Sequence, residues 1–174
     1  MHLLNELVGK RIIDGADNEI AVAEGLNITL PHFYVYLRAK GGELANIRGR
    51  LNEFIQVNEI DVIDEDIHLY KDLKALTHLI RSVDMESEEA YRVRELIGLD
   101  VISSDDMKIG TVSDIGLSKE RRKLFFIVSG QRVEEIRGNP TERVKLDEVI
   151  KIRNYVKIGI PFSEYVYSIK KEPK

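Results

Sequence analysis

The segment Glu95–Ile102, with the sequence ELIGLDVI, occurs in a related form 89 residues earlier, as ELVGKRII at Glu6–Ile13. Sliding the chain against itself by this offset aligns residues 5–69 with residues 94–158 without a gap, and 13 of these 65 positions are identical. Average composition would give about four identities by chance. The sequence therefore predicts an internal duplication, with two similar domains of 65 residues each.

One tripeptide is repeated outside this opening segment. Ile-Arg-Gly occurs at residues 47–49 and again at 136–138, and a glutamate follows it in both copies, as Glu53 and Glu142. A turn glycine with a solvated neighbour is the simplest interpretation. Because Arg48 and Arg137 persist where most polar positions differ, a shared salt bridge or a pair of contact sites is the alternative.

Each copy has the apolar pattern of short β-strands. Polar turns at 14–18 and 103–106 separate apolar segments and predict hairpins, whereas Phe33–Leu37 and Leu124–Val128 are continuous β-branched and aromatic runs typical of buried strands. Three further short apolar segments end each copy. Five or six short strands in so small a domain bury their edges by curling into a barrel.

The residues between the copies change period. Leu73, Leu76, Ile80 and Val83 are three or four apart, which predicts an amphipathic helix, and Ser87 is a plausible N-cap for a second short helix that leads into the next copy. We expect a first barrel at 1–70, a helical linker at 71–93, a second barrel at 94–160, and a C-terminal strand and tail at 161–174.

Composition excludes several kinds of protein. The chain has 174 residues, a net charge of −4 and no cysteine, so it has no disulfide, thiolate metal site or thiol nucleophile. It shows no apolar run near the length of a membrane span, and its start lacks the pattern of a signal peptide. We therefore expect a cytoplasmic protein without membrane insertion.

Motifs for catalysis are missing from the sequence. There is no phosphate-binding loop or nucleotide-binding glycine fingerprint, and the four histidines are far apart. Clustered carboxylates suit hard divalent cations, but a turn between two strands explains the acidic group at Asp61, Asp64, Glu65 and Asp66 better. We expect no catalytic residue, no cofactor and no metal site.

The second copy resembles the PRC-barrel family over its whole length. The resemblance rests on ELIGLDVI followed by DMKIGTVSDI at residues 106–115, that is, a leucine and glycine before a strand, a polar turn, Ile-Gly-x-Val and an acidic residue. The first copy departs from it, with Ala21 in place of Gly110 and Gly25 in place of Asp114. The resemblance implies an all-β protein of two tandem small antiparallel PRC-type β-barrels from an internal duplication.

The resemblance also implies a module without chemistry of its own. Family members occur as the cytoplasmic domain of a photosynthetic reaction-centre subunit, as half of a ribosome-maturation factor, and as stand-alone archaeal proteins. Some of the last group resemble adaptors of the division ring built on a tubulin-like GTPase, and this group fits the sequence best. It implies a non-catalytic adaptor or scaffold, cytoplasmic and at the division site, in an oligomer with a ring adaptor or anchor or a homologous PRC-barrel protein.

The candidate contact residues come from three places: the repeated arginines, the basic run at 119–123, and the aromatic C-terminal segment beyond the aligned repeat. They are Arg48, Arg137, Arg121, Arg122, Phe162, Tyr165 and Tyr167. The basic run also supports the alternative function, an RNA-associated ribosome-maturation or RNA-processing factor, because clustered cations meet phosphates.

The two copies differ in charge. Residues 5–69 carry 6 basic and 12 acidic residues, net −6, whereas residues 94–158 carry 13 basic and 11 acidic residues, net +2. Two interpretations stay open. The copies attract each other within one chain, or the basic copy of one molecule binds the acidic copy of the next and builds a head-to-tail assembly.

Overall fold

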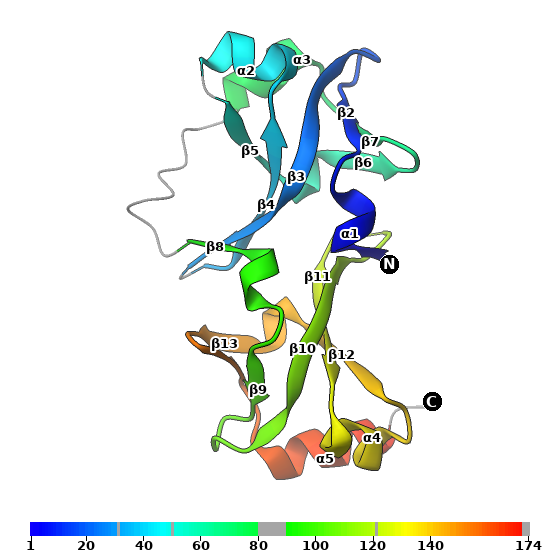
Figure 1. The fold of residues 1–174 in the computed structure, drawn as a ribbon, viewed down its shortest axis with the longest axis vertical. Coiled ribbons are helices and arrows are strands. Elements are labelled where there is room, and N and C mark those ends of the chain that lie inside the picture. Colours follow the sequence, from blue (N-terminus) through cyan, green and yellow to red (C-terminus); the bar gives the residue numbers. More distant parts are fainter. Residues whose placement is uncertain (31, 50, 80–89, 121, 172–174) are drawn as a thin grey trace. The chain divides into compact units, whose positions relative to one another are not determined.

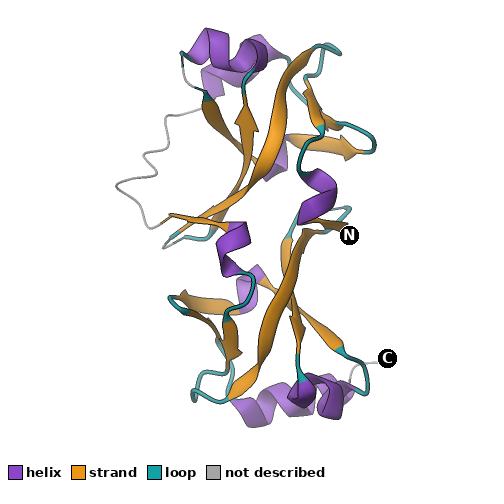
Figure 2. Cartoon of the chain, in the orientation of Figure 1, coloured by secondary structure: helices purple, strands orange, loops and turns teal. Residues whose placement is uncertain are grey.

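The computed structural model describes the chain except residues 31, 50, 80–89, 121 and 172–174 (Figure 1). The chain divides into two compact units. Unit 1 comprises Met1–Arg94 and Leu117–Arg122, and unit 2 comprises Glu95–Gly116 and Lys123–Lys174. Strands are the main regular structure of both units, with short helices between them (Figure 2). The predicted mainly-β fold is confirmed.

Unit 1 is built on one sheet with the strand order β5-β4-β3-β2-β7-β6, and β8 pairs with β3 outside this order. Its elements are β1 (His2–Leu3), α1 (Leu4–Leu7), β2 (Arg11–Ile13), β3 (Glu19–Thr29), β4 (Tyr34–Lys40), α2 (Gly42–Arg48), β5 (Asn52–Gln56), the 3₁₀ turn η1 (Val57–Glu59), β6 (Ile60–Ile63), β7 (Ile67–Leu69), α3 (Leu73–Leu79) and β8 (Ala90–Arg92).

Unit 2 repeats this order as β12-β11-β10-β9-β14-β13. From the end of unit 1 onward, the elements are η2 (Val93–Leu96), β9 (Asp100–Ile102), β10 (Lys108–Leu117), β11 (Leu124–Ser129), α4 (Gln131–Arg137), β12 (Thr141–Lys145), η3 (Leu146–Glu148), β13 (Val149–Ile152), β14 (Tyr155–Ile158) and α5 (Phe162–Lys171).

The sheets are mixed, so the expectation of purely antiparallel barrels is wrong in one respect. β2 pairs with β7, and β9 pairs with β14, in parallel. Parallel neighbours need a long crossover, and here the intervening strands and helix of each repeat form it. Among the described residues, no pairing joins the two end strands of either order into a closed ring.

The duplication is visible in the structure at the offset of 89 residues. β2 corresponds to β9, α2 to α4, and β5 to β12, each with bounds that match residue for residue. Unusual backbone conformations recur too, since Asp17 and Asp106 have φ values of 64° and 65°, and Gly49 and Gly138 have 70° and 73°. The correspondence continues past the aligned residues, because α3 and α5 begin 89 residues apart.

The cores of the two units are built from equivalent positions. Leu7 and Leu96 are at most 1% exposed, and Leu37 and Phe126 are both 0% exposed. The alternating burial of β11, in which every second residue from Leu124 is buried, is that of a strand with one face on the core. The apolar pattern that repeats in the sequence therefore marks the same core positions in both units.

The prediction of a C-terminal strand was wrong for the described residues 161–171. Phe162–Lys171 forms helix α5, the counterpart of α3. Aromatic residues at 165 and 167 suggested a strand, but Tyr165 is 5% exposed and Tyr167 is 61% exposed, so the two side chains do not share one environment. Helical spacing from Phe162 to Tyr165 places these two on one face.

The linker at 71–93 is only partly helical. α3 covers Leu73–Leu79 as predicted, whereas Ile80, Val83 and Ser87 lie outside the described residues. Residues 90–92 form strand β8 instead of a second helix, in antiparallel register with Asn27–Thr29 of β3. Unit 1 therefore contains two segments from the second half of the sequence, β8 and Leu117–Arg122.

Candidate functional site

The repeated Ile-Arg-Gly tripeptide ends a helix in both units. Gly49 and Gly138 are the left-handed C-cap residues of α2 and α4, with N–H groups that donate to the carbonyls of Ala45 and Glu134 at 2.8 Å. Glycine adopts this conformation without the strain that a side chain imposes. The glycine is therefore a turn residue as expected, but the arginine before it, in the last helical turn, is not a solvated neighbour, since its side chain is only 21% exposed in α2 and 15% in α4.

Both arginines form ion pairs with the repeated glutamates. Nε of Arg48 donates to Oε1 of Glu53 at 3.4 Å. Nε of Arg137 donates to Oε2 of Glu142, and its Nη2 donates to Oε1 at 3.2 Å, which makes a two-point contact. The glutamate side chains are only 4% and 9% exposed. The shared salt bridge is therefore present, and it engages both guanidinium groups inside their own units.

The basic run at 119–123 is divided between the two units, since Arg122 belongs to unit 1 and Lys123 to unit 2. Nη2 of Arg122 donates to the main-chain carbonyl of Asp61 in β6, and Nζ of Lys123 lies 3.8 Å from Oδ2 of Asp147 in unit 2. Arg121 lies outside the described residues. Arg122 therefore packs against β6, an end strand of the sheet of unit 1.

The three aromatic candidates in α5 differ in their contacts and in their exposure to solvent. The N–H of Phe162 donates to Oδ1 of Asp105 at 2.9 Å, and the guanidinium carbon of Arg132 lies 5.0 Å from the centre of the Phe162 ring. Tyr165 is buried, and Tyr167 is exposed. Of the three candidates in this helix, only Tyr167 therefore presents most of its surface to solvent.

Asp105 gives the start of α5 a pH dependence. Hydrogen bonds from the Ser103 hydroxyl, and then from the N–H of Phe162, hold the pKa of Asp105 below its ordinary value. A carboxyl group with a lower pKa in the folded state stabilises that state above its ordinary pKa, and this stabilisation is lost as the pH falls through the folded value. We expect the Phe162 amide to exchange faster as the pH falls below about 4, relative to amides elsewhere in unit 2.

Hydrogen exchange followed by NMR measures this effect after correction for the intrinsic exchange rate. Asp105→Asn is the control, because the amide cannot ionise and its Phe162 protection should not change with pH in this range. Equal acid dependence of Phe162 protection in the two proteins would contradict the assignment to Asp105.

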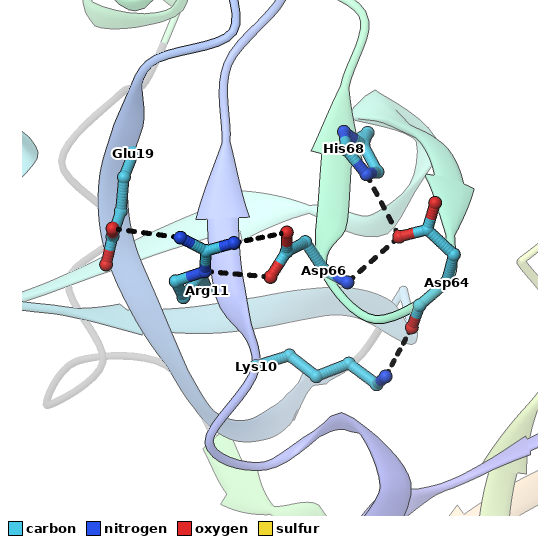
Figure 3. A network of polar contacts seen from close by, with 6 residues as sticks. All are labelled: Lys10, Arg11, Glu19, Asp64, Asp66 and His68. Atoms are coloured by element: carbon cyan, nitrogen blue, oxygen red, sulfur yellow. Dashed lines mark hydrogen bonds and ion pairs between the residues drawn. The ribbon is translucent and has the colours of Figure 1, made fainter.

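A network of charged side chains lies where β2, β3 and the β6–β7 turn meet in unit 1 (Figure 3). Arg11 lies between two carboxylates, with Nε and Nη2 at 3.0 and 2.8 Å from the oxygens of Asp66, and Nη1 at 3.6 Å from Glu19. We call this network the charged corner: Lys10, Arg11, Glu19, Asp64, Asp66 and His68.

The acidic turn within the charged corner is held by its own backbone. The N–H of Asp66 donates to Oδ1 of Asp64 at 2.9 Å, Nε2 of His68 lies 3.0 Å from the same oxygen, and Nζ of Lys10 donates to the Asp64 carbonyl. The Asp66 N–H, and after it His68, hold the pKa of Asp64 below its ordinary value. The turn interpretation is confirmed for Asp64, Glu65 and Asp66, which lie between β6 and β7, whereas Asp61 lies within β6. Within the described ranges, no group of three or more histidine, cysteine, aspartate or glutamate residues could hold a metal ion.

Three of the six positions of the charged corner carry the opposite charge in unit 2. Asp100 stands in place of Arg11 and Lys108 in place of Glu19, and Nζ of Lys108 lies 3.1 Å from Oδ1 of Asp100. In the turn, Arg153 replaces Asp64 and Tyr155 replaces Asp66. The ion pair between the first two strands of the repeat is therefore kept, with the positive and negative residues exchanged. The aligned repeats could have revealed this exchange, whereas the total charges of the two copies did not locate it.

The fold and these polar contacts define a class of protein: a duplicated, mainly-β scaffold whose prominent charged residues pair with one another. Residues 88–171 match the PRC-barrel domain family, so the chain contains a PRC-barrel domain that extends from β8 to α5. The resemblance seen in the second copy is confirmed. The comparison with curated proteins found no match. None of the helices in the described part of the chain has the length and apolar character needed to cross a membrane.

Proposed function

We propose that this protein is a non-catalytic adaptor or scaffold for protein–protein interaction, with two tandem PRC-barrel domains of the stand-alone archaeal type. It acts in the cytoplasm at the division site, in the machinery of the tubulin-like ring. Its partners are a ring adaptor or anchor, or a homologous PRC-barrel protein.

The proposal that the first repeat is also a PRC-barrel domain is supported by its element order. Each helix and strand between Arg11 and Gln56 has a counterpart in unit 2 at the same offset. The departures from the family pattern are single residues, Ala21 and Gly25, on a strand whose pairing is otherwise kept.

The observation that carries the adaptor function is the reversal of charge on a retained scaffold. The first repeat is net −6 and the second net +2, and the charged corner shows the reversal at paired positions. Electrostatic complementarity mainly sets the choice of partner. Two copies of one scaffold with opposite patterns are therefore suited to hold two different proteins.

The two interpretations of the charge difference predict different behaviour in solution. The hydrogen bond from Arg122 to the Asp61 carbonyl is internal to unit 1 and does not separate them. Attraction within one chain predicts a species whose size does not change with concentration. Sedimentation velocity at low and high salt distinguishes the two interpretations, because a head-to-tail assembly would grow with concentration and dissociate with salt.

The test of the adaptor function is affinity capture of the tagged protein from nuclease-treated native extract, with identification of the bound proteins. We expect division-ring components or a PRC-barrel protein. The matched variant gives unit 1 the unit 2 residues, Arg11→Asp, Glu19→Lys and Asp66→Tyr, and should lose the partner of the acidic repeat while keeping the other. Capture of ribosomal proteins that nuclease removes would overturn the proposal in favour of the RNA-associated function.

A further inference from the structure

Arg38 and Arg92 of unit 1 lie on one face of the sheet. Asn27 of β3 pairs directly with Arg92 of β8, so their side chains leave the same face. Nη1 of Arg38, in β4, donates to Oδ1 of Asn27 at 3.0 Å. Arg94 follows two residues after Arg92, and the positive charges of both act on Arg38. The pairing of β8 with β3 therefore brings Arg38 and Arg92 to one face, and Arg94 follows in η2, directly after β8.

The guanidinium group of Arg38 lies where a glycine leaves room for it. A Cβ atom added to Gly25 would be 3.1 Å from Nη2 of Arg38. In the second repeat the equivalent of Gly25 is Asp114 and the equivalent of Arg38 is Ile127. Unit 1 thus has the cation Arg38 where the second repeat has the apolar Ile127. It also has Gly25 where the second repeat has the carboxylate of Asp114.

Within the described residues, Arg38 shares its carboxylate partner with a lysine. Glu24 lies 3.5 Å from Nε of Arg38, but its other oxygen is 3.1 Å from Nζ of Lys40. Arg92 and Arg94 are exposed, and neither has an ion pair with any residue in the described part of the chain. Burial lowers the pKa of Arg38, and the charge of Arg92 lowers it further. Among the residues that the structure describes, Glu24 is therefore the carboxylate that pairs with Arg38, and it also pairs with Lys40.

We propose that Arg38, Arg92 and Arg94 form a binding site for the carboxylate side chains of an acidic segment in a partner protein. The proposal rests on the adaptor function and names the chemistry of one partner. Guanidinium groups bind carboxylates through paired, charge-assisted hydrogen bonds, and a recessed Arg38 flanked by two exposed arginines fits one or two such groups.

An acidic peptide fits this site better than RNA does. A nucleic acid presents phosphates along its whole length and needs an extended basic track. The repeat that surrounds the site carries 12 acidic and 6 basic residues, so it repels such a polyanion outside the three arginines. A short acidic segment has to match only the local cluster.

The experiment measures fluorescence anisotropy of a labelled peptide of alternating glutamate and glycine, titrated with the full chain. Arg92→Ser with Arg94→Ser should weaken binding about tenfold or more, since two charge-assisted contacts are lost. Arg143→Ser with Arg153→Ser changes the net charge equally at exposed arginines of unit 2 and should bind as the unchanged protein does.

A second variant tests the site without removal of an arginine. Gly25→Asp places a carboxylate beside Arg38 and should compete with the peptide, with a loss of affinity of severalfold. Binding that is undetectable in the unchanged protein, or that falls equally in the two arginine pairs, would overturn the proposal. Tighter binding of an oligouridylate of the same length through Arg92 and Arg94 would overturn it in favour of RNA.

The failure of this site is separable from failure of the adaptor function. One outcome is that the acidic peptide does not bind the unchanged protein, while the variant with both Arg92→Ser and Arg94→Ser captures the same partners from extract as the unchanged protein. In that case the adaptor function stands and the proposed arginine site is wrong. If neither variant nor unchanged protein captures a partner, the adaptor function itself is contradicted.

Discussion

Replacement of Arg137 by methionine should lower the free energy of unfolding of unit 2 by about 3 kcal/mol. Glu142 has a side chain that is 9% exposed, and Arg137 provides its two-point cationic partner. Removal of the cation leaves a nearly buried carboxylate without compensation, and this penalty exceeds the net value of the pair itself. Urea denaturation followed by circular dichroism measures the change.

The control is the double variant Arg137→Met with Glu142→Met. Because it removes both charges, it should recover most of the lost stability. A loss below about 0.5 kcal/mol in the single variant, the range of an exposed surface pair, would show that the pair is not structural. It would return Arg137, and with it Arg48, to the candidates for partner contact.

Replacement of Phe126 by alanine should cost about 4 kcal/mol of unfolding free energy. Phe126 is a fully buried residue of β11, and the sheet around it cannot collapse to fill the space that a phenyl ring leaves. The cost combines the lost transfer free energy of the ring with that of the cavity. Thermal and urea unfolding report it.

Two comparisons sharpen this prediction. Ile150→Ala, at a residue that is 56% exposed, should change stability by no more than about 0.5 kcal/mol. Leu37→Ala, at the equivalent buried position of unit 1, should destabilise the other core by about 3 kcal/mol. If the units unfold in separate transitions, Phe126→Ala shifts the transition of unit 2 and Leu37→Ala shifts that of unit 1. A loss below about 1 kcal/mol for Phe126→Ala would contradict the assignment of this strand to the core.

The candidate site was only partly predictable. Repetition of Arg48 and Arg137 marked them in the sequence, but their partners, five residues later in each copy, became clear only when α2 folded against β5 and α4 against β12. Arg38 and Arg92 gave no signal, because 54 residues separate them and only the pairing of β8 with β3 places them on one face.

The sequence by itself determined the duplication, the mainly-β class, the helix at Leu73–Leu79 and the turn glycines. These features depend on local periodicity, or on a backbone conformation that one residue type favours, and both are readable within a few positions. Tertiary structure alone decided the parallel pairing of β2 with β7, the transfer of β8 to the sheet of unit 1, and the helical state of α5. Each depends on which distant segment offers free backbone groups or an apolar face, and no local pattern carries that information.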